Sequence, residues 1–228
     1  SCDVPCVLIT GGFRPADALV ADAERLQVPL LQTAVGTPAA IAKLGSLLED
    51  HLAERETIHA VLMDILGLGV LIAGESGIGK SECALELVMR GHRLVADDVV
   101  LIGPDADGAP AGWSPELVRH YIELRGIGIV HVPSLFGETA VADRARIELV
   151  VRLEAWGVGE VERIGLERRS ESVAGFSIEV LTLPVAPGRN IASLVEVGAR
   201  NHVLRSRGKS GAEELDARVF ALLRGEGG

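Results

Sequence analysis

One short segment, residues 74–81, constrains the fold of this chain more than any other part of its sequence. It reads Gly-Glu-Ser-Gly-Ile-Gly-Lys-Ser, which matches the phosphate-binding loop pattern GxxxxGK[ST]. An apolar run, residues 70–73, comes directly before it, and a segment with helical character, residues 82–89, comes directly after it. A loop of this kind works at a strand-to-helix junction, so these neighbours predict an α/β fold in which the loop joins a buried strand to a helix.

This segment, called the phosphate loop below, has the chemistry to hold a phosphorylated ligand such as ATP. Its glycines let successive backbone N–H groups turn toward an anion, and the start of the next helix adds a partial positive charge. We expect Lys80 to reach the outer phosphates and the Ser81 hydroxyl to ligate Mg²⁺. A loop that binds nucleotide without transferring phosphate remains an alternative. The predicted nucleotide-binding residues are Gly74, Glu75, Ser76, Gly77, Ile78, Gly79, Lys80 and Ser81.

Two adjacent acids, Asp97 and Asp98, end the apolar segment that follows the predicted helix. In phosphate-loop enzymes an acid at such a strand end lies beside the metal and the terminal phosphate. Neighbouring side chains on a strand point to opposite sides, so only one of the two can face the reacting phosphate. The other is expected to orient Lys80 or a metal-bound water. The facing carboxylate is a candidate to accept the proton of an attacking hydroxyl, and a turn-forming Asp pair is the structural alternative.

Five further residues are candidates for the site on weaker grounds. Two residues apart in extended backbone, Glu123 and Arg125 would lie on one face, as a Mg²⁺ ligand and a phosphate clamp. A surface ion pair at a helix end is the alternative. A lone histidine such as His59 is usually structural. Arg163 and Arg189 lie in polar breaks between strands, where each is either a phosphate-stabilising group or a solvated side chain.

Composition narrows the class of protein. The net charge of −10 argues against general binding of nucleic acids or anionic membranes, because a like-signed field repels both. Three cysteines in 228 residues do not form a disulfide framework, and a reduced cytosolic setting fits. Cys83, just past the phosphate loop, is expected to fill the core. The chain contains neither an apolar run of transmembrane length nor a signal-peptide pattern.

The order of apolar and polar segments predicts two parts. Residues 1–50 read as a βαβα piece with a helix that starts at Thr37-Pro38, and they are too few to form a comfortable domain alone. In the remainder we expect a hairpin of residues 58–66 and 69–73, and a strand 94–96 that residues 99–102 continue. Further predictions are a turn-rich loop at 103–112, a helix at 115–122, an exposed strand at 145–153, strands at 127–132 and 178–185, and a final helix from Ser210.

With these residues identified, the chain resembles the HPr kinase/phosphorylase family. The similar segments lie between Thr57 and the C-terminus, and two of them are not general features of phosphate-loop proteins. Residues 1–50 resemble the end of the family's N-terminal domain, whose front part is not present in this sequence. The segments that carry the resemblance are residues 57–59, the phosphate loop with its strand, residues 90–98, 115–117, the signature 123–129, residues 163–166 and residues 184–190.

The resemblance implies a fold, a reaction and a set of partners. The fold is an α/β phosphate-loop kinase domain over residues 51–228, similar to the nucleotide-binding domain of phosphoenolpyruvate carboxykinase. Residues 1–50 are then the C-terminal part of a smaller α/β domain with a linker helix. The reaction is ATP- and Mg²⁺-dependent phosphorylation of a serine of the phosphocarrier protein HPr, together with its reversal by inorganic phosphate to give pyrophosphate. The family resemblance also implies a cytoplasmic homohexamer.

The resemblance also assigns roles residue by residue. His59, Lys80, Asp98 and Arg163 fall on the family's catalytic positions, and its Mg²⁺ ligands fall on Ser81 and Glu123. Residues 122–131 match a segment used in both activities, and residues 185–190 match a segment tied to dephosphorylation. Two positions depart from the family pattern: Glu75 replaces an Asp in the phosphate loop, and Ala186 stands where an Arg is common. The competing interpretations are a small-molecule kinase and a nucleotide-sensing module without transfer chemistry.

Overall fold

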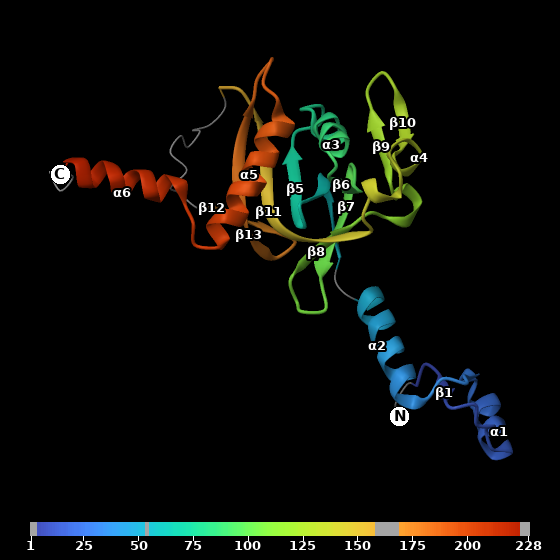
Figure 1. The fold of residues 1–228 in the computed structure, drawn as a ribbon. Coiled ribbons are helices and arrows are strands. Elements are labelled where there is room, and N and C mark those ends of the chain that lie inside the picture. Colours follow the sequence, from blue (N-terminus) through green and yellow to red (C-terminus); the bar gives the residue numbers. More distant parts are fainter. Residues whose placement is uncertain (1–3, 53–54, 158–168, 224–228) are drawn as a thin grey trace. The chain divides into compact units, whose positions relative to one another are not determined.

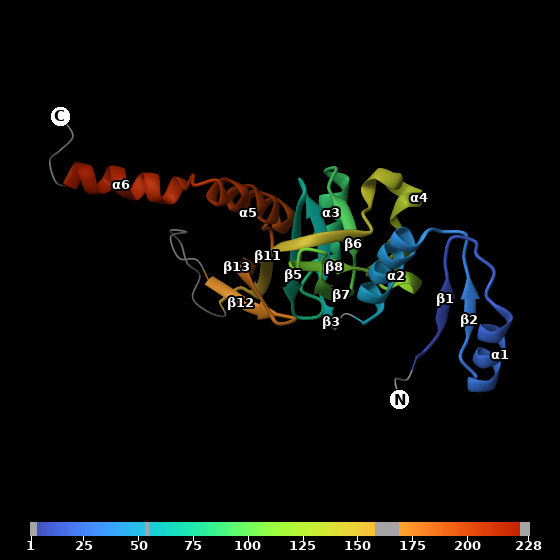
Figure 2. The same ribbon diagram turned by 90° about the horizontal axis from the view of Figure 1, so that it is seen from below.

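A computed structural model of the chain describes residues 4–52, 55–157 and 169–223 (Figure 1, and in a view turned by 90° in Figure 2). It divides the chain into two units, residues 1–54 and 55–228. The smaller unit is a βαβα piece in which strand β1 pairs in parallel with strand β2. Its last helix has Thr37 as its first residue. The Thr37-Pro38 pattern had predicted Thr37 as the N-cap and Pro38 as the first helical residue. The elements of this unit are β1 (Val7–Ile9), α1 (Asp17–Leu26), β2 (Leu30–Gln32) and α2 (Thr37–Leu52).

The larger unit is built on one mixed sheet. Its described residues form nine strands in the order β3-β7-β8-β11-β5-β4-β6, with β13 also paired to β11 and β12 paired to β13. Strands β5, β11 and β13 run in parallel, whereas β4 is antiparallel to both β5 and β6. The strands are β3 (Glu56–His59), β4 (Val61–Ile65), β5 (Leu68–Gly74), β6 (Arg93–Ala96), β7 (Val99–Pro104), β8 (Pro110–Trp113), β11 (Arg144–Ala155), β12 (Arg169–Val173) and β13 (Phe176–Val185).

Helices and a separate hairpin complete this unit. Strands β9 and β10 form an antiparallel two-stranded sheet of their own. None of the helices in the described part of the chain is long and apolar enough to cross a bilayer. The remaining elements are α3 (Lys80–Met89), η1 (Glu116–Val118), β9 (Tyr121–Leu124), β10 (Gly128–His131), α4 (Val132–Phe136), η2 (Glu138–Ala140), α5 (Ile191–Ser206) and α6 (Gly211–Leu223).

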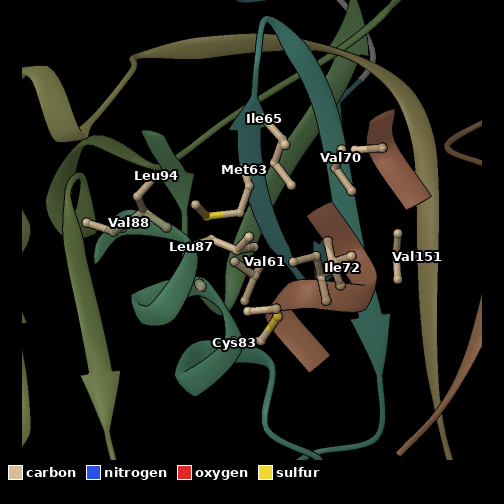
Figure 3. Close-up of a cluster of buried hydrophobic side chains, with 14 of the residues drawn as sticks. Val61, Met63, Ile65, Val70, Ile72, Cys83, Leu87, Val88, Leu94 and Val151 are labelled. Carbon is tan, nitrogen blue, oxygen red and sulfur yellow. The ribbon is translucent and has the colours of Figure 1, made fainter. Parts of the chain in front are cut away.

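The main sheet is buried on both faces, which explains its near-continuous apolar strands. In β4, the side chains of Val61 and Met63 belong to one core cluster and the side chain of Leu62 to the other, because successive residues of a strand point to opposite faces. Helices α3 and α5 cover the first cluster with residues such as Leu87 and Val195. Figure 3 shows Leu87 and Cys83 of α3 directed at the strands. The sheet core therefore fixes the start of α3, and with it the phosphate loop.

The predicted hairpin before the phosphate loop is present but shorter than expected. Strands β4 and β5 are antiparallel and pair from Val61↔Ile72 to Ile65↔Leu68. Residues 58–66, however, are not one strand: the chain leaves β3 at His59, and β3 pairs with β7 rather than with β5. His59 therefore ends one strand instead of starting the strand before the loop.

Two other expectations about strands are wrong. Residues 99–102 do not continue the strand 94–96, because Asp98 has a φ of 63° and turns the chain from β6 into β7. The strand predicted at 145–153 is not exposed: β11 lies between β5, β8 and β13, and Val150 and Val151 are fully buried. A strand with partners on both sides and with both faces buried is apolar throughout its centre.

The helix predicted at 115–122 is also wrong, and several elements were not expected. One 3₁₀ turn, η1, occupies residues 116–118, and His120 then adopts a φ of 67° and leads into β9. The supposed loop 103–112 contains the end of β7 and the start of β8, which pair as an antiparallel hairpin. Strand β12, helix α4 and helix α5 have no counterpart among the predicted elements. The final helix, α6, begins at Gly211, directly after Ser210 as the capping pattern predicts.

Candidate active site

The direction of three strands brings the candidate residues to one edge of the sheet. Strand β6 runs in the same direction as β5, since both are antiparallel to β4. The two strands therefore end at the same edge, with the phosphate loop after β5 and the pair Asp97-Asp98 after β6. Ligands of open α/β sheets bind at the carboxyl ends of such strands. Residues as far apart in sequence as Ser81 and Asp97 thus become neighbours in the site because of the strand order.

The phosphate loop is a tight turn between β5 and α3. Gly74, Gly77 and Gly79 have φ values of 151°, 82° and 104°, of which the last two lie well inside the region that favours glycine. The Lys80 ammonium donates hydrogen bonds to the carbonyl oxygens of Gly74 and Glu75, at 2.9 and 3.0 Å. The lysine is thus folded back over its own loop, with its charge at the mouth of the anion-binding turn. This position agrees with the predicted contact between Lys80 and outer phosphates.

Asp97 connects two of the other candidate residues. Its Oδ1 accepts a hydrogen bond from the Ser81 hydroxyl at 2.8 Å, and its Oδ2 accepts one from the backbone N–H of Glu123 at 3.0 Å. The side chain is buried, with 7% of the residue exposed. Burial raises the pKa of Asp97, while the hydrogen bonds from Glu123 and Ser81 act in the opposite direction. The residue positions Ser81 and β9; the structure records no contact between Asp97 and Lys80.

Asp98 lies on the solvent side of the same turn and is paired with His59. The Nδ1 atom of His59 is 3.6 Å from Oδ1 of Asp98, and both side chains are largely exposed. The two come together because β3 and β7 are antiparallel partners, with His59 opposite Val99. Asp97 thus points inward and Asp98 outward, as alternation along the chain predicts. A carboxylate next to an imidazole at the mouth of a phosphate site can exchange a proton with a substrate hydroxyl.

A single cavity of about 250 Å³ collects most of these groups. It contains the cations Lys80 and Arg125 together with several carboxylates, so it is polar and of mixed charge. The Ser81 hydroxyl and the Glu123 carboxylate are hard oxygen donors, which is the ligand type that Mg²⁺ prefers, alongside waters and substrate phosphates. Its lining residues are Val61, Ser76, Gly77, Gly79, Lys80, Ser81, Glu82, Asp97, Asp98, Glu123 and Arg125.

These donors fit Mg²⁺ only if the substrate supplies further ligands. In the described ranges 4–52, 55–157 and 169–223, no group of three or more His, Cys, Asp or Glu side chains is placed to hold a metal. Mg²⁺ usually keeps several waters and binds through one or two protein groups plus phosphate oxygens. The pair Ser81 and Glu123 is therefore a sufficient protein contribution for a metal–nucleotide complex.

A larger cavity of about 650 Å³ lies on the other side of the loop. It shares Gly74, Glu75 and Ile78 with the phosphate loop, and His59 forms part of its wall. A charged pair closes another part of the wall, where Arg152 donates to both carboxylate oxygens of Glu171 at 2.7 Å. No sequence pattern predicted this cavity, because residues of β12 and of the end of β11 come together in its wall only when the sheet forms.

Several sequence candidates are not in the site or cannot be placed. Arg163 lies outside the described residues. Arg189 does not line the small cavity; it donates to the carbonyl oxygen of Pro184 at 3.2 Å and lies over the Trp156 ring. Cys83 fills the core as expected, where burial raises the pKa of its thiol to about 12. The prediction for Asp97 was incomplete. The two adjacent acids indicated that one of them belongs to the site, but the hydrogen bonds of Asp97 with Ser81 and Glu123 were not predicted.

Comparison with known proteins identifies relatives of this chain. A family model described as "HPr Serine kinase C-terminal domain" matches residues 50–219. The HPr kinase/phosphorylase of Exiguobacterium sibiricum is 45% identical over 99% of this chain and 73% of its own length. That of Geobacter sulfurreducens is 41% identical over 96% of this chain and 69% of its own length.

A solved structure gives the same result for the fold. The structure of the Hpr(Ser) kinase/phosphatase from Coxiella burnetii matches with a TM-score of 0.63 and 37% sequence identity. The match covers 67% of this chain and 93% of that chain. The mixed α/β architecture of the larger unit is therefore that of an HPr kinase C-terminal domain. By the matched family model and by its similarity to these relatives, the chain belongs to the HPr kinase/phosphorylase family.

Proposed function

We propose that this protein transfers the terminal phosphoryl group of ATP to a serine hydroxyl of HPr and also catalyses removal of that group by inorganic phosphate. The observation that carries the proposal is the cavity in which the phosphate loop, Lys80 and Asp98 lie together. An anion-binding turn alone would serve a nucleotide sensor. A carboxylate at the mouth of that turn adds the proton acceptor that a transfer reaction to an alcohol requires.

In the forward direction, the loop amides and Lys80 hold the phosphate chain while the serine hydroxyl attacks the terminal phosphorus. The bond from that phosphorus to the bridging oxygen of ADP breaks as the bond to the serine oxygen forms. Asp98 takes the serine proton, and His59, 3.6 Å away, is placed to stabilise the carboxyl group as its charge changes. Arg163, by its family position, would neutralise charge on the phosphoryl group in flight.

Ser81 and Glu123 would hold the Mg²⁺ that the family resemblance implies. When bound, Mg²⁺ neutralises charge on the outer phosphate oxygens. Asp97 fixes the orientation of the Ser81 hydroxyl in the cavity, because its carboxylate accepts a hydrogen bond from that hydroxyl at 2.8 Å. The oxygen of Ser81 then retains a lone pair for the metal, and Glu123 is held in place through its own backbone.

The reverse reaction uses the same anion site. Inorganic phosphate in the loop attacks the phosphorus of phosphoserine, which yields pyrophosphate and frees the serine oxygen, and Asp98 returns a proton to that oxygen. One site serves both directions because the loop amides recognise phosphate oxygens and not the nucleoside. The segment 185–190, tied to dephosphorylation in the family, carries Ala186 in place of the common Arg, and we expect the reverse reaction to be the less efficient one.

The wider setting follows from family membership. We propose a cytoplasmic homohexamer that acts on HPr, with residues 51–228 as the catalytic domain and residues 1–50 as the end of an N-terminal domain. We also propose that the catalytic fold is related to the nucleotide-binding domain of phosphoenolpyruvate carboxykinase. The hairpin β4–β5 directly before the phosphate loop is the feature that supports this relation.

The test is a two-step assay with HPr. The protein is mixed with HPr and Mg²⁺–ATP, and phosphoserine formation is followed by mass spectrometry; phosphate is then added and pyrophosphate is measured. We expect both products, and we expect Lys80→Ala to lose both. Phosphorolysis at a normal rate in Lys80→Ala would contradict a shared anion site. Transfer to a small molecule but not to HPr would identify a metabolite kinase, and no transfer at all would identify a nucleotide sensor.

A further inference from the structure

A second cation, Arg125, lies against the phosphate loop although it is 48 residues away from Gly77 in the sequence. A Cβ atom added to Gly77 would be 2.8 Å from Nη2 and 3.1 Å from Nη1 of Arg125. The guanidinium group is thus packed over the bare backbone of Gly77. Both residues line the small cavity together with Lys80. A planar cation therefore covers one side of the anion-binding turn.

The backbone around Arg125 fixes this position. Arg125 is the second residue of a tight turn in which the Ile127 N–H donates to the carbonyl oxygen of Leu124 at 3.1 Å. Gly126 follows with a φ of 84°, the positive value that a type II turn needs at its third residue. On one side of the turn, β9 is anchored by its buried Ile122 and Leu124 side chains. The Arg125 side chain is thus presented to the loop from an anchored strand end.

The guanidinium group of Arg125 has no acidic partner among the residues that the structure describes. Among residues 4–52, 55–157 and 169–223, no carboxylate forms an ion pair or hydrogen bond with its guanidinium group. Other arginines near the site are paired: Arg90 with Glu86 and Glu196, and Arg152 with Glu171. In a chain with a net charge of −10, an unpaired arginine held against an anion-binding turn is available for a ligand anion.

We propose that Arg125 is a catalytic residue whose guanidinium group binds the oxygens of the phosphoryl group being transferred. The inference rests on the proposed function and gives a defined role to one residue of the segment 122–131, which the sequence indicated only as a candidate phosphate clamp. The fork of N–H donors suits two oxygens of one phosphate group, whereas Lys80 acts as a point charge at the mouth of the anion-binding turn. The phosphoryl group would lie between them, so Arg125 serves ATP in one direction and pyrophosphate in the other.

The experiment is a calorimetric titration of the full chain with Mg²⁺–pyrophosphate, which contains the phosphate oxygens but no nucleoside. We expect Arg125→Ala to weaken binding about 10- to 100-fold, because a charge-assisted bidentate contact is lost. The affinity of Arg125→Lys should lie between those of Arg125→Ala and the unsubstituted protein, because lysine keeps the charge but lacks the planar fork of N–H donors. Arg207→Ala removes the same charge at an exposed position outside the cavity, and we expect it to bind as the unsubstituted protein does.

The outcomes separate this inference from the proposed function. If Arg125→Ala binds pyrophosphate within about twofold of the unsubstituted protein while Lys80→Ala loses binding, Arg125 is not part of the anion site and the proposed function stands. If the unsubstituted protein does not bind pyrophosphate, the shared anion site fails and Arg125 has no role in it. Equal losses in Arg125→Ala and Arg207→Ala, with normal binding in Arg125→Lys, would reduce the effect to net charge and overturn the inference.

Folding of the variants is checked by thermal unfolding. The Arg125 side chain is exposed and makes no ion pair in the described part of the chain, so we expect the midpoint to change by no more than about 2 °C. Arg125→Gln, which keeps a polar side chain with N–H donors and removes the charge, provides a second variant. It should lose pyrophosphate affinity as Arg125→Ala does, and normal affinity in a folded Arg125→Gln protein would also count against the inference.

Discussion

The Ser81 hydroxyl donates a hydrogen bond of 2.8 Å to Oδ1 of Asp97, across the junction between helix α3 and the end of strand β6. The same carboxylate accepts the N–H of Glu123 at 3.0 Å. One buried acid therefore orients both residues that are proposed to hold Mg²⁺. Groups behind metal ligands in this way set the orientation and basicity of those ligands.

Replacing Asp97 by Asn is expected to weaken the use of Mg²⁺. Ser81 and Glu123 donate to different carboxylate oxygens, and an amide has an NH2 group, which cannot accept, in place of one of them, so one of the two loses its acceptor. We expect Mg²⁺-dependent nucleotide binding to become about 10- to 100-fold weaker. A Mg²⁺ titration in the presence of a fluorescent nucleotide measures this. Asp107→Asn, an exposed acid in the β7–β8 turn, is the control, and superimposable titrations for both variants would contradict the role of Asp97.

Replacing Asp98 by Asn is expected to stop chemistry without stopping binding. The amide cannot accept the serine proton, so the rate of phosphoryl transfer to HPr should fall by about 10²- to 10⁴-fold. Asp98 has no hydrogen bond to the phosphate loop, and we expect nucleotide affinity to be unchanged. Rapid-quench measurement of phosphoserine formation and a separate binding titration test the two parts. A variant that keeps the full transfer rate would mean that another group is the base.

Replacing Asn190 by Ala is expected to destabilise the contact between helices α3 and α5. The Asn190 side chain caps α5 by accepting the Ser193 N–H at 2.7 Å, and it donates to Glu86 of α3 at 2.6 Å. Loss of an N-cap costs about 1 kcal/mol in the free energy of unfolding. Urea denaturation measures the difference. Asn201→Ala, an exposed position on the same helix, is the matched control, and we expect no loss of stability there because Ala favours helix.

The carboxyl group of Glu86 should make stability depend on pH. Hydrogen bonds from Asn190 and then from Arg90 lower the pKa of Glu86 below its ordinary value of 4.5. A lowered pKa in the folded state stabilises the fold above the unfolded value, and this contribution is lost as the pH falls through the folded value. Glu86→Gln should therefore be less stable than the unsubstituted protein at pH 7, and the two should converge in acid below 4.5.

Urea denaturation at pH 7 and at several acid pH values tests this dependence on Glu86. Glu138→Gln, at the exposed start of η2, provides a control in which the difference should be small throughout. A constant difference between Glu86→Gln and the unsubstituted protein at all pH values would show that packing, and not ionisation, is responsible.

The errors in the predicted fold have common physical causes. The helix predicted at 115–122 followed from Pro115 as a helix start, but the left-handed φ of His120 and the alternating burial of β9 belong to a turn and a strand. The continuous strand predicted through 94–102 missed the positive φ of Asp98, which is rare for residues other than glycine. Both errors lie next to the site, where pairing with distant strands overrides local preference.

The site itself was predictable in its parts but not in its assembly. Residue types and spacing identified Lys80, Ser81 and the pair of acids, because phosphate binding and proton transfer demand particular groups. The register of β6 against β4 and the position of β9 determine which of the two acids points inward and which residues it binds. The pairing of His59 with Asp98 likewise arises from β3 and β7, which local sequence patterns did not separate.

By itself, the sequence determined the phosphate loop, since backbone turns that present N–H groups to an anion need glycine at fixed positions whatever the rest of the chain does. It also determined family membership, which segments such as residues 123–129 carry. Only the tertiary structure decided that Arg125 lies on Gly77 and that Asp97 holds Ser81. These contacts join residues from separate strands, and their geometry follows from strand order and register, which are settled by burial of both faces of the sheet.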